Sequence, residues 1–208
     1  MQLMAISKQM NKETELKKIK DEIVACKKCS LNETRIYPVV GQGSHEADIV
    51  LVGEAPGANE DKQARPFCGA AGKILEELLE SISLKRDQVY ICNILKCRPP
   101  SNRDPRPEET QACTPYLERQ LEAISPKVVG AMGNHAVNFL MKHFGLEDKI
   151  QGISKIHGSS FEIELPSKKI KLVPLYHPAV AVYNANMKES LRGDFKALLK
   201  EKKRQEKP

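Results

Sequence analysis

Three stretches of the chain repeat one order of apolar segment, loop and helix-forming segment, and this repeat constrains the fold more than any other feature. The apolar segments 48–52, 89–94 and 127–131 are typical of buried strands, and each is followed by a loop and by apolar residues at helical spacing. Strands joined through helices lie parallel in one sheet. With a further strand over 171–174, the repeat predicts an α/β fold, a three-layer α/β/α arrangement with a central, mostly parallel four-stranded sheet.

The helices are expected between and around these strands. An amphipathic helix over about 16–24 should precede the first strand, and another should follow Gly69. Later helices are expected from about Pro107, where a proline suits the first turn, over 134–144 and over 181–200. In such folds ligands bind at the loops beyond the carboxyl ends of the strands. The loops after the strands are therefore where we look for a site.

Length and composition indicate one globular unit. The chain has 208 residues, 40% of them hydrophobic and 29% charged, which suits a single core with a well solvated surface. We expect a single domain over residues 1–200 and a basic C-terminal tail over 201–208. The net charge of +6 favours a polyanionic partner, although an ordinary basic surface explains it equally well.

Targeting signals are not evident in the sequence. Residues 1–20 lack the pattern of a secretory signal, and no stretch has the apolar length of a membrane span. We therefore expect an intracellular, cytoplasmic protein without a membrane partner, associated with the nucleoid if the source is prokaryotic. The cysteines should then be reduced.

Four of the six cysteines, Cys26, Cys29, Cys97 and Cys113, are candidates for one shared site. Cys26 and Cys29 are separated by two residues, the spacing with which two thiolates bind one metal centre, whereas Cys97 and Cys113 are distant single residues. This arrangement predicts a metal site, and the residues alone leave open whether it holds zinc or an iron–sulfur cluster.

An ordered set of short motifs resembles one known family, the iron–sulfur uracil-DNA glycosylases, also called family 4 or type-4. The resemblance covers about residues 26–179. It rests, besides the four cysteines, on Gly53-Glu-Ala-Pro-Gly57, Glu60-Asp-Lys62, Arg65-Pro-Phe67, Gly69-Ala-Ala-Gly72, Asn93, Cys97-Arg-Pro-Pro100 and His177-Pro-Ala179.

The resemblance implies an activity and its partners. It implies a monofunctional glycosylase that hydrolyses the N-glycosidic bond of deoxyuridine in DNA, releasing uracil and leaving an abasic site for base excision repair. It also implies a [4Fe-4S] cluster held by Cys26, Cys29, Cys97 and Cys113. The expected substrate is uracil-containing DNA, single or double stranded. We expect a monomer, with a replication or repair clamp as a further candidate partner.

Three residues receive roles through this resemblance. Phe67 would stack on the flipped base, Asn93 would read the uracil edge, and His177 would stabilise the uracil anion. An amide pairs with the adjacent carbonyl and N–H of uracil, whereas cytosine would leave polar groups unpaired. Each residue also has a structural explanation: a core aromatic for Phe67, a strand-end cap for Asn93 and a surface turn for His177.

The loop after the first strand is expected to line the base. Glu54, Ala55 and Pro56 are its predicted substrate-binding residues, and Glu60 follows them. In better-known uracil glycosylases an Asp that polarises water occupies the position of Ala55, so water activation lacks an evident residue here. Glu54, which we count among the catalytic residues with Asn93, and Glu60 are candidates for orienting water or excluding thymine. Either carboxylate could instead be solvated.

Two further segments are candidates for DNA contact. The basic, proline-rich segment 98–106 lies between two of the cysteines and is expected to face phosphates, although a solvated loop is the alternative. Residues 180–183 could form an apolar wedge or simply begin the last helix.

Two competing functions remain open at this point. One is a uracil-DNA binding protein that traps its base covalently, as a related subgroup does with a nucleophilic histidine after the base-reading strand. No histidine occurs between Asn93 and Cys113, which argues against it. The other is a metal-stapled nucleic-acid binding module without chemistry.

Overall fold

The computed structural model describes the backbone of residues 2–205 and the side chains of residues 11–205. Its centre is a six-stranded sheet with the order β1-β3-β2-β4-β6-β5. The four inner strands are parallel, and each edge strand is antiparallel to its neighbour. The strands are β1 (Gln42–Gly43), β2 (Ile49–Gly53), β3 (Tyr90–Asn93), β4 (Val128–Met132), β5 (Phe161–Leu165) and β6 (Lys168–Leu175).

The predicted α/β class and parallel core are confirmed, but the predicted number of four strands is wrong for the whole sheet. The four predicted strands form its parallel centre. The two additional strands are the antiparallel edges β1 and β5. A strand of two residues such as β1 is too short to show the alternation of apolar and polar residues by which a strand is recognised.

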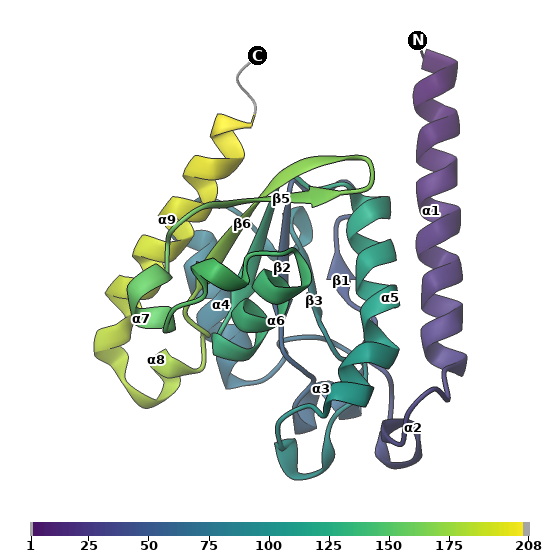
Figure 1. Ribbon diagram of the computed structural model, residues 1–208, viewed down its shortest axis with the longest axis horizontal. Helices are drawn as coiled ribbons and strands as arrows, with labels where there is room; N and C mark the ends of the chain where they lie inside the picture. The colour runs from purple at the N-terminus through teal and green to yellow at the C-terminus, as the bar shows by residue number, and fades with distance from the viewer. Residues whose placement is uncertain (1, 206–208) are drawn as a thin grey trace.

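Helices cover both faces of the sheet, which gives the three expected layers (Figure 1). In the described residues, α1, α5 and α6 pack on one face, and α4 and α9 on the other. The helices are α1 (Gln2–Ala25), α2 (Leu31–Thr34), α3 (Ala58–Gln63), α4 (Ala70–Glu80), α5 (Pro107–Ile124), α6 (Asn134–His143), α7 (Ile153–Ile156), α8 (Val180–Tyr183) and α9 (Lys188–Arg204).

The buried strands divide their side chains between two cores. In β2, Val50 and Val52 pack towards α1, α5 and α6, whereas Ile49 and Leu51 pack towards α4 and α9. Successive side chains of a strand point to opposite faces, so a strand buried on both faces must be apolar throughout. This is why the inner strands appear in the sequence as unbroken apolar runs.

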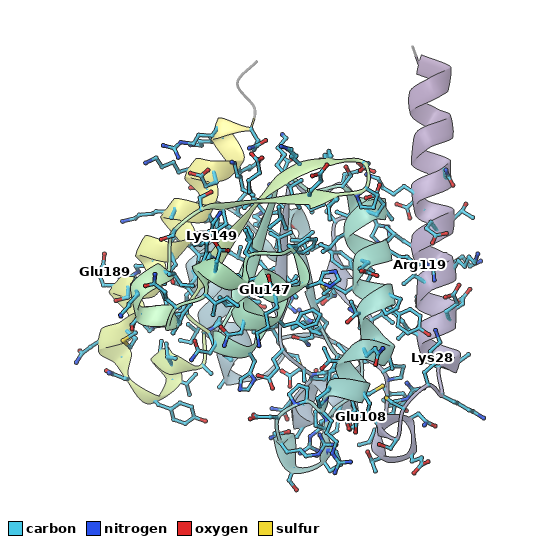
Figure 2. All side chains as sticks on the ribbon, viewed as in Figure 1. Lys28, Glu108, Arg119, Glu147, Lys149 and Glu189 are labelled. Carbon is cyan, nitrogen blue, oxygen red and sulfur yellow. The ribbon has the colours of Figure 1, made fainter. Side chains whose placement is uncertain are left out.

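Helix α1 lies along α5 at one side of the molecule (Figure 1). Its buried residues Leu16, Ile19 and Ile23 have the spacing of one helix face, as predicted. Arg119 lies between the two helices (Figure 2) and pairs with Glu15 and Glu22 of α1 at 2.7 and 2.5 Å. The C-terminal end of α1 is thereby held where Cys26 follows it.

The C-terminal region departs from the expected single helix over 181–200. The chain forms the short α8, a 3₁₀ turn at Ala185–Met187 and then α9, which continues to Arg204. Glu201 is buried within α9, so the first residues of the predicted tail are part of the helix. Residues 206–208 of that tail lie outside the described part of the chain. Over the described residues, no helix has the length and apolar character that crossing a bilayer requires.

Candidate active site and cysteine centre

Asn93 ends β3 beside Gly53, which ends the neighbouring parallel strand β2. Asn93 is only 2% exposed. A Cβ atom placed on Gly53 would lie 2.4 Å from Asn93 Oδ1 and 3.0 Å from the ring of Phe67. The amide and the aromatic ring therefore meet above the backbone of Gly53, at the carboxyl end of the sheet where a ligand is expected.

Phe67 lies in the loop between α3 and α4, in a left-handed backbone conformation with φ of 49°. Such a conformation is costly for a bulky residue and persists only where its surroundings enforce it. Two contacts do so: the Arg86 guanidinium donates to the carbonyls of Pro66 and Phe67, and the backbone of Gly72 packs against the Phe67 carbonyl. The ring is buried and held in place.

Glu60 of α3 fixes the same loop from the other side. Its Oε1 accepts hydrogen bonds from the backbone N–H groups of Cys68 and Gly69, at 3.1 and 3.3 Å. Gly69 is the residue that precedes α4. The carboxylate of Glu60 is thus not simply solvated, because it ties α3 to the start of α4 beside Phe67.

His177 follows β6, and its ring centroid lies 5.5 Å from that of Phe67 with the ring planes tilted by 32°. Its Nδ1 accepts a hydrogen bond from the backbone N–H of Ala179 at 3.1 Å. Burial lowers the pKa of His177 to about 4, so the ring is neutral at neutral pH. Because Nδ1 accepts, the proton of the neutral ring is on Nε2, which remains available as a donor.

The four cysteines converge at the end of the molecule below α1 and α5. Cys26 follows α1, Cys29 precedes α2, Cys97 follows β3 and Cys113 lies in α5. All four line one small cavity. Cys97 and Cys113 pack with the apolar side chains of Leu31, Leu95 and Ala55.

Polar groups lie around the cysteine sulfurs. Arg35 Nη1 donates to Cys97 Sγ at 3.0 Å. Burial raises the pKa of Cys29 and Cys113, and the N–H groups of Leu31 and Lys96 oppose that shift. Donors directed at sulfur favour thiolates, the form in which cysteine binds metal.

Burial of these cysteines has the opposite effect on their charge. It raises the pKa of the Cys29 and Cys97 thiols, and that of Cys113 to about 11. A bound cation deprotonates its thiol ligands outright. The donor set of four convergent thiols with polar groups around them therefore fits a metal centre of thiolate ligands.

Comparison with known proteins decides the family. Residues 40–201 match the uracil DNA glycosylase superfamily. The chain belongs to the uracil-DNA glycosylase superfamily. A type-4 uracil-DNA glycosylase of Sulfurisphaera tokodaii is 46% identical over 184 residues, 88% of this chain and 83% of that protein. One from Archaeoglobus fulgidus is 49% identical over 177 residues, 85% of this chain and 88% of that protein.

A relative of lower sequence identity is also named as a type-4 uracil-DNA glycosylase. A type-4 uracil-DNA glycosylase of Thermotoga maritima is 41% identical over 166 residues, 80% of this chain and 82% of that protein. The expected resemblance to type-4 members is therefore confirmed. As a superfamily member the chain is a glycosylase of the hydrolase class.

In this superfamily member, Glu54 has ionisable neighbours that the sequence did not indicate. The ligand-type atoms of Glu54, Asp104 and His135 all lie within 4.8 Å of one another, and His135 Nε2 is 3.5 Å from Asp104 Oδ1. Burial and, to a lesser extent, Asp104 raise the pKa of Glu54, whereas His135 lowers it. His135 closely follows β4, and this position beyond a strand end was the one sequence signal that could have indicated it as a site residue. Nothing in the sequence indicated that Asp104 lies near Glu54.

Ala55 and Pro56, the other predicted residues of this loop, have packing roles. Pro56 is buried, and Ala55 packs against the cysteine group. The loop also bonds to the segment after β3, because the Glu54 carbonyl accepts from the N–H of Leu95 at 3.0 Å. The 54–57 loop thus lies between the end of β3 and the cysteine centre.

The segment 98–106 is held by an internal ion pair. Arg103 donates to both carboxylate oxygens of Glu109, and the N–H of Arg106 donates to the same group at 2.8 Å. These bonds lower the pKa of the Glu109 carboxyl. Arg103 is therefore occupied within the protein, while Arg106 is exposed and Arg98 half-buried. The basic character of this loop is only partly available to phosphates.

Proposed function

We propose that this chain is a monofunctional uracil-DNA glycosylase that hydrolyses the N-glycosidic bond of deoxyuridine and leaves an abasic site. The observation that supports this most directly is the convergence of the Asn93 amide and the Phe67 ring above Gly53, with His177 beside the ring. A planar base fits such a combination of one aromatic face and one amide. The names of the relatives point to the same substrate.

In this proposal the base leaves the DNA stack and enters the pocket. Stacking on an aromatic ring contributes roughly 1–3 kcal/mol, which offsets part of the cost of unstacking. Asn93 offers a carbonyl oxygen and an NH₂ group side by side, which match the N3–H and the O4 carbonyl of uracil. Cytosine presents the opposite pattern, so its buried polar groups would stay unpaired.

His177 would stabilise the departing uracil as an anion. A neutral imidazole with its proton on Nε2 donates a hydrogen bond to the O2 oxygen, where negative charge develops as the glycosidic bond breaks. A donor of this kind typically contributes about 10² to 10³ in rate. The ring acts as a neutral donor throughout, because its lowered pKa keeps it from taking up a second proton.

Water is proposed to be oriented by Glu54. The side chain at position 55 is a methyl group, which cannot polarise water. Glu60 is committed to the N–H groups of Cys68 and Gly69, which leaves Glu54 as the better candidate. Burial raises the pKa of its carboxyl, and His135 opposes that shift.

The cysteine centre is proposed to hold a [4Fe-4S] cluster through Cys26, Cys29, Cys97 and Cys113. When bound, the cluster supplies a cross-link between α1, the segment after β3 and α5, and no chemistry of the glycosidic bond. Zinc is the alternative for four thiolates. A visible absorbance band with about four irons per chain supports the cluster, whereas a colourless protein with one zinc contradicts it.

Asn93→Ala tests the proposed function. The purified chain is incubated with an oligonucleotide containing one deoxyuridine, then treated with alkali, which cuts the strand at abasic sites. The wild type should yield cut strand and free uracil, and Asn93→Ala should lose about 10³-fold or more in rate while keeping its metal.

Other outcomes identify the competing functions. An intact strand with wild-type protein contradicts the enzyme. A protein–DNA adduct that survives denaturation indicates the covalent trap instead. Binding without any release of uracil indicates a nucleic-acid binding module.

A further inference from the structure

Lys96 is a lysine in the interior of the protein, with a side chain that is 1% exposed. A buried amino group is costly unless hydrogen-bond acceptors surround it. Its Nζ donates to the backbone carbonyl of Asn93 and to Oε1 of Gln120, both at 2.7 Å. One of its two partners is thus the residue proposed to read the base.

The Asn93 carbonyl needs this donor because the sheet does not supply one. The N–H of Ile94 bonds to Gly53 of β2, so the polar backbone groups of Asn93 point to the other side, towards β1. Strand β1 begins at Gln42, opposite Ile91, and does not extend as far as Asn93. The Lys96 side chain supplies the hydrogen bond to the Asn93 carbonyl that a longer β1 would otherwise supply.

Gln120 of α5 connects the same lysine to the start of the base-reading strand. Its Nε2 donates to the hydroxyl of Tyr90 at 3.1 Å and to the carbonyl of Val40 at 2.9 Å. Tyr90 and Asn93 are the first and last residues of β3. Lys96 and Gln120 together therefore bond to both ends of this strand.

The backbone of Lys96 belongs to the cysteine centre. Lys96 lines the same small cavity as the four cysteines, its carbonyl accepts from the N–H of Val39 at 2.7 Å, and the next residue is Cys97. One residue thus contacts the cysteine centre through its main chain and the base-reading strand through its side chain. The two sites share this residue.

We propose that Lys96 is a positioning residue for base recognition, which orients Asn93 through its carbonyl and links the pocket to the cysteine centre. The inference rests on the proposed function, because it assigns Asn93 to the uracil edge. Lys96 acts in this role through its hydrogen bonds rather than through its charge. A change in the direction of the Asn93 backbone would move the amide away from the base, and a misplacement of about 1 Å costs up to roughly 10²-fold in rate.

Lys96→Met is the main test, because methionine retains most of the volume and removes the donor. We expect kcat to fall about tenfold to a hundredfold, and the inhibition constant of free uracil to rise about tenfold. KM for DNA should stay within about twofold, because Lys96 is buried and cannot contact a phosphate. Iron content and visible absorbance should match those of the wild type.

Two further variants keep the test decisive. Lys12→Met is the matched control. Lys12 also donates to α5, at the Ile124 carbonyl, but its other partner is Glu46 and not Asn93. The kcat and the uracil inhibition constant of this variant should equal those of the wild type. Gln120→Met leaves Lys96 in place and removes one acceptor. It should lower kcat by about threefold to tenfold, and it decides the question if Lys96→Met does not fold.

The outcomes separate the two proposals. A wild type that releases no uracil overturns the proposed function, and the inference with it. A wild type that releases uracil, with a folded Lys96→Met whose kcat and uracil inhibition are unchanged, overturns the inference alone. The same holds for a Lys96→Met whose losses only follow lost iron and lowered Tm, since that result indicates a structural role.

Discussion

Gly53 separates the two side chains that are proposed to hold the base. Its missing Cβ is the reason that Asn93 Oδ1 and the ring of Phe67 can approach the same point of backbone. Gly53 has ordinary strand geometry and belongs to β2, so the close approach, rather than an unusual φ, requires glycine there. The proposed base site therefore depends on an absent side chain as much as on those present.

Gly53→Ala should abolish function without unfolding the chain. A methyl group 2.4 Å from Asn93 Oδ1 forces the amide or the strand to move. We expect kcat for uracil release to fall by at least about 10²-fold, while Tm falls by only a few degrees. Single-turnover excision and thermal unfolding measure the two effects.

Gly193 provides the matched control. It lies in α9, and apart from its chain neighbours and the nearby helix backbone no atom of the described residues lies within 4 Å of the position that a methyl group would occupy there. Gly193→Ala should therefore stabilise the helix by about 0.5–1 kcal/mol and leave kcat unchanged. Equal activity of Gly53→Ala and the wild type would show that the Asn93 and Phe67 side chains do not form the pocket as proposed.

The residues that the structure brings together were accessible from the sequence only in part. Asn93 and His177 were predicted as site residues because they follow strands and match motifs in order, and their roles stay predictions. Lys96 was not, although a lysine inside the apolar run before Cys97 is unusual enough to be a signal for a buried partner. Its acceptor Gln120 is distant in sequence, and only the packing of α5 against β3 brings the two together.

At the level of elements, the helical periodicity of the sequence did not predict the break between α8 and α9. Apolar residues continue across 180–183, so the last helix was expected to begin there. In the structure Asn184 is extended, and its side chain accepts from the N–H of Asn186, which starts a new turn. The break leaves Val182 43% and Tyr183 90% exposed, next in sequence to the His177 loop.

Tyr183→Ala should separate duplex from single-stranded substrates. Tyr183 is an exposed aromatic residue six positions after His177, and such a side chain is a candidate to fill the gap that a flipped base leaves in a duplex. Single-stranded DNA has no such gap. We expect excision from duplex DNA to slow by about tenfold and excision from single strands to change less than about twofold. Comparable losses on both substrates would indicate that Tyr183 contacts the base or its backbone rather than the duplex.

On the scale of the whole molecule, the cysteine centre joins parts that the sheet alone does not hold. Its cysteines come from the end of α1, the segment after β3 and α5. The Arg35 guanidinium links the same parts, because it donates to the Cys97 sulfur and to the carbonyls of Val24 and Cys26. The sequence predicted which cysteines lie together. It could not predict the surrounding donors, because each comes from a different element whose position depends on the completed fold.

Cys26→Ser should therefore loosen one region of the molecule and not the whole. We expect loss of visible absorbance and a fall in Tm of about 10 °C or more, because metal binding energy contributes to folding. Hydrogen exchange should rise in α1, in residues 27–39 and in residues 97–106, while β2 and β4 stay protected. Cys68→Ser is the control, since Cys68 lies outside the centre and should keep its iron and its exchange pattern. Uniform loss of protection over the sheet would mean that the centre supports the entire core, and not only the junction between α1, α5 and β3.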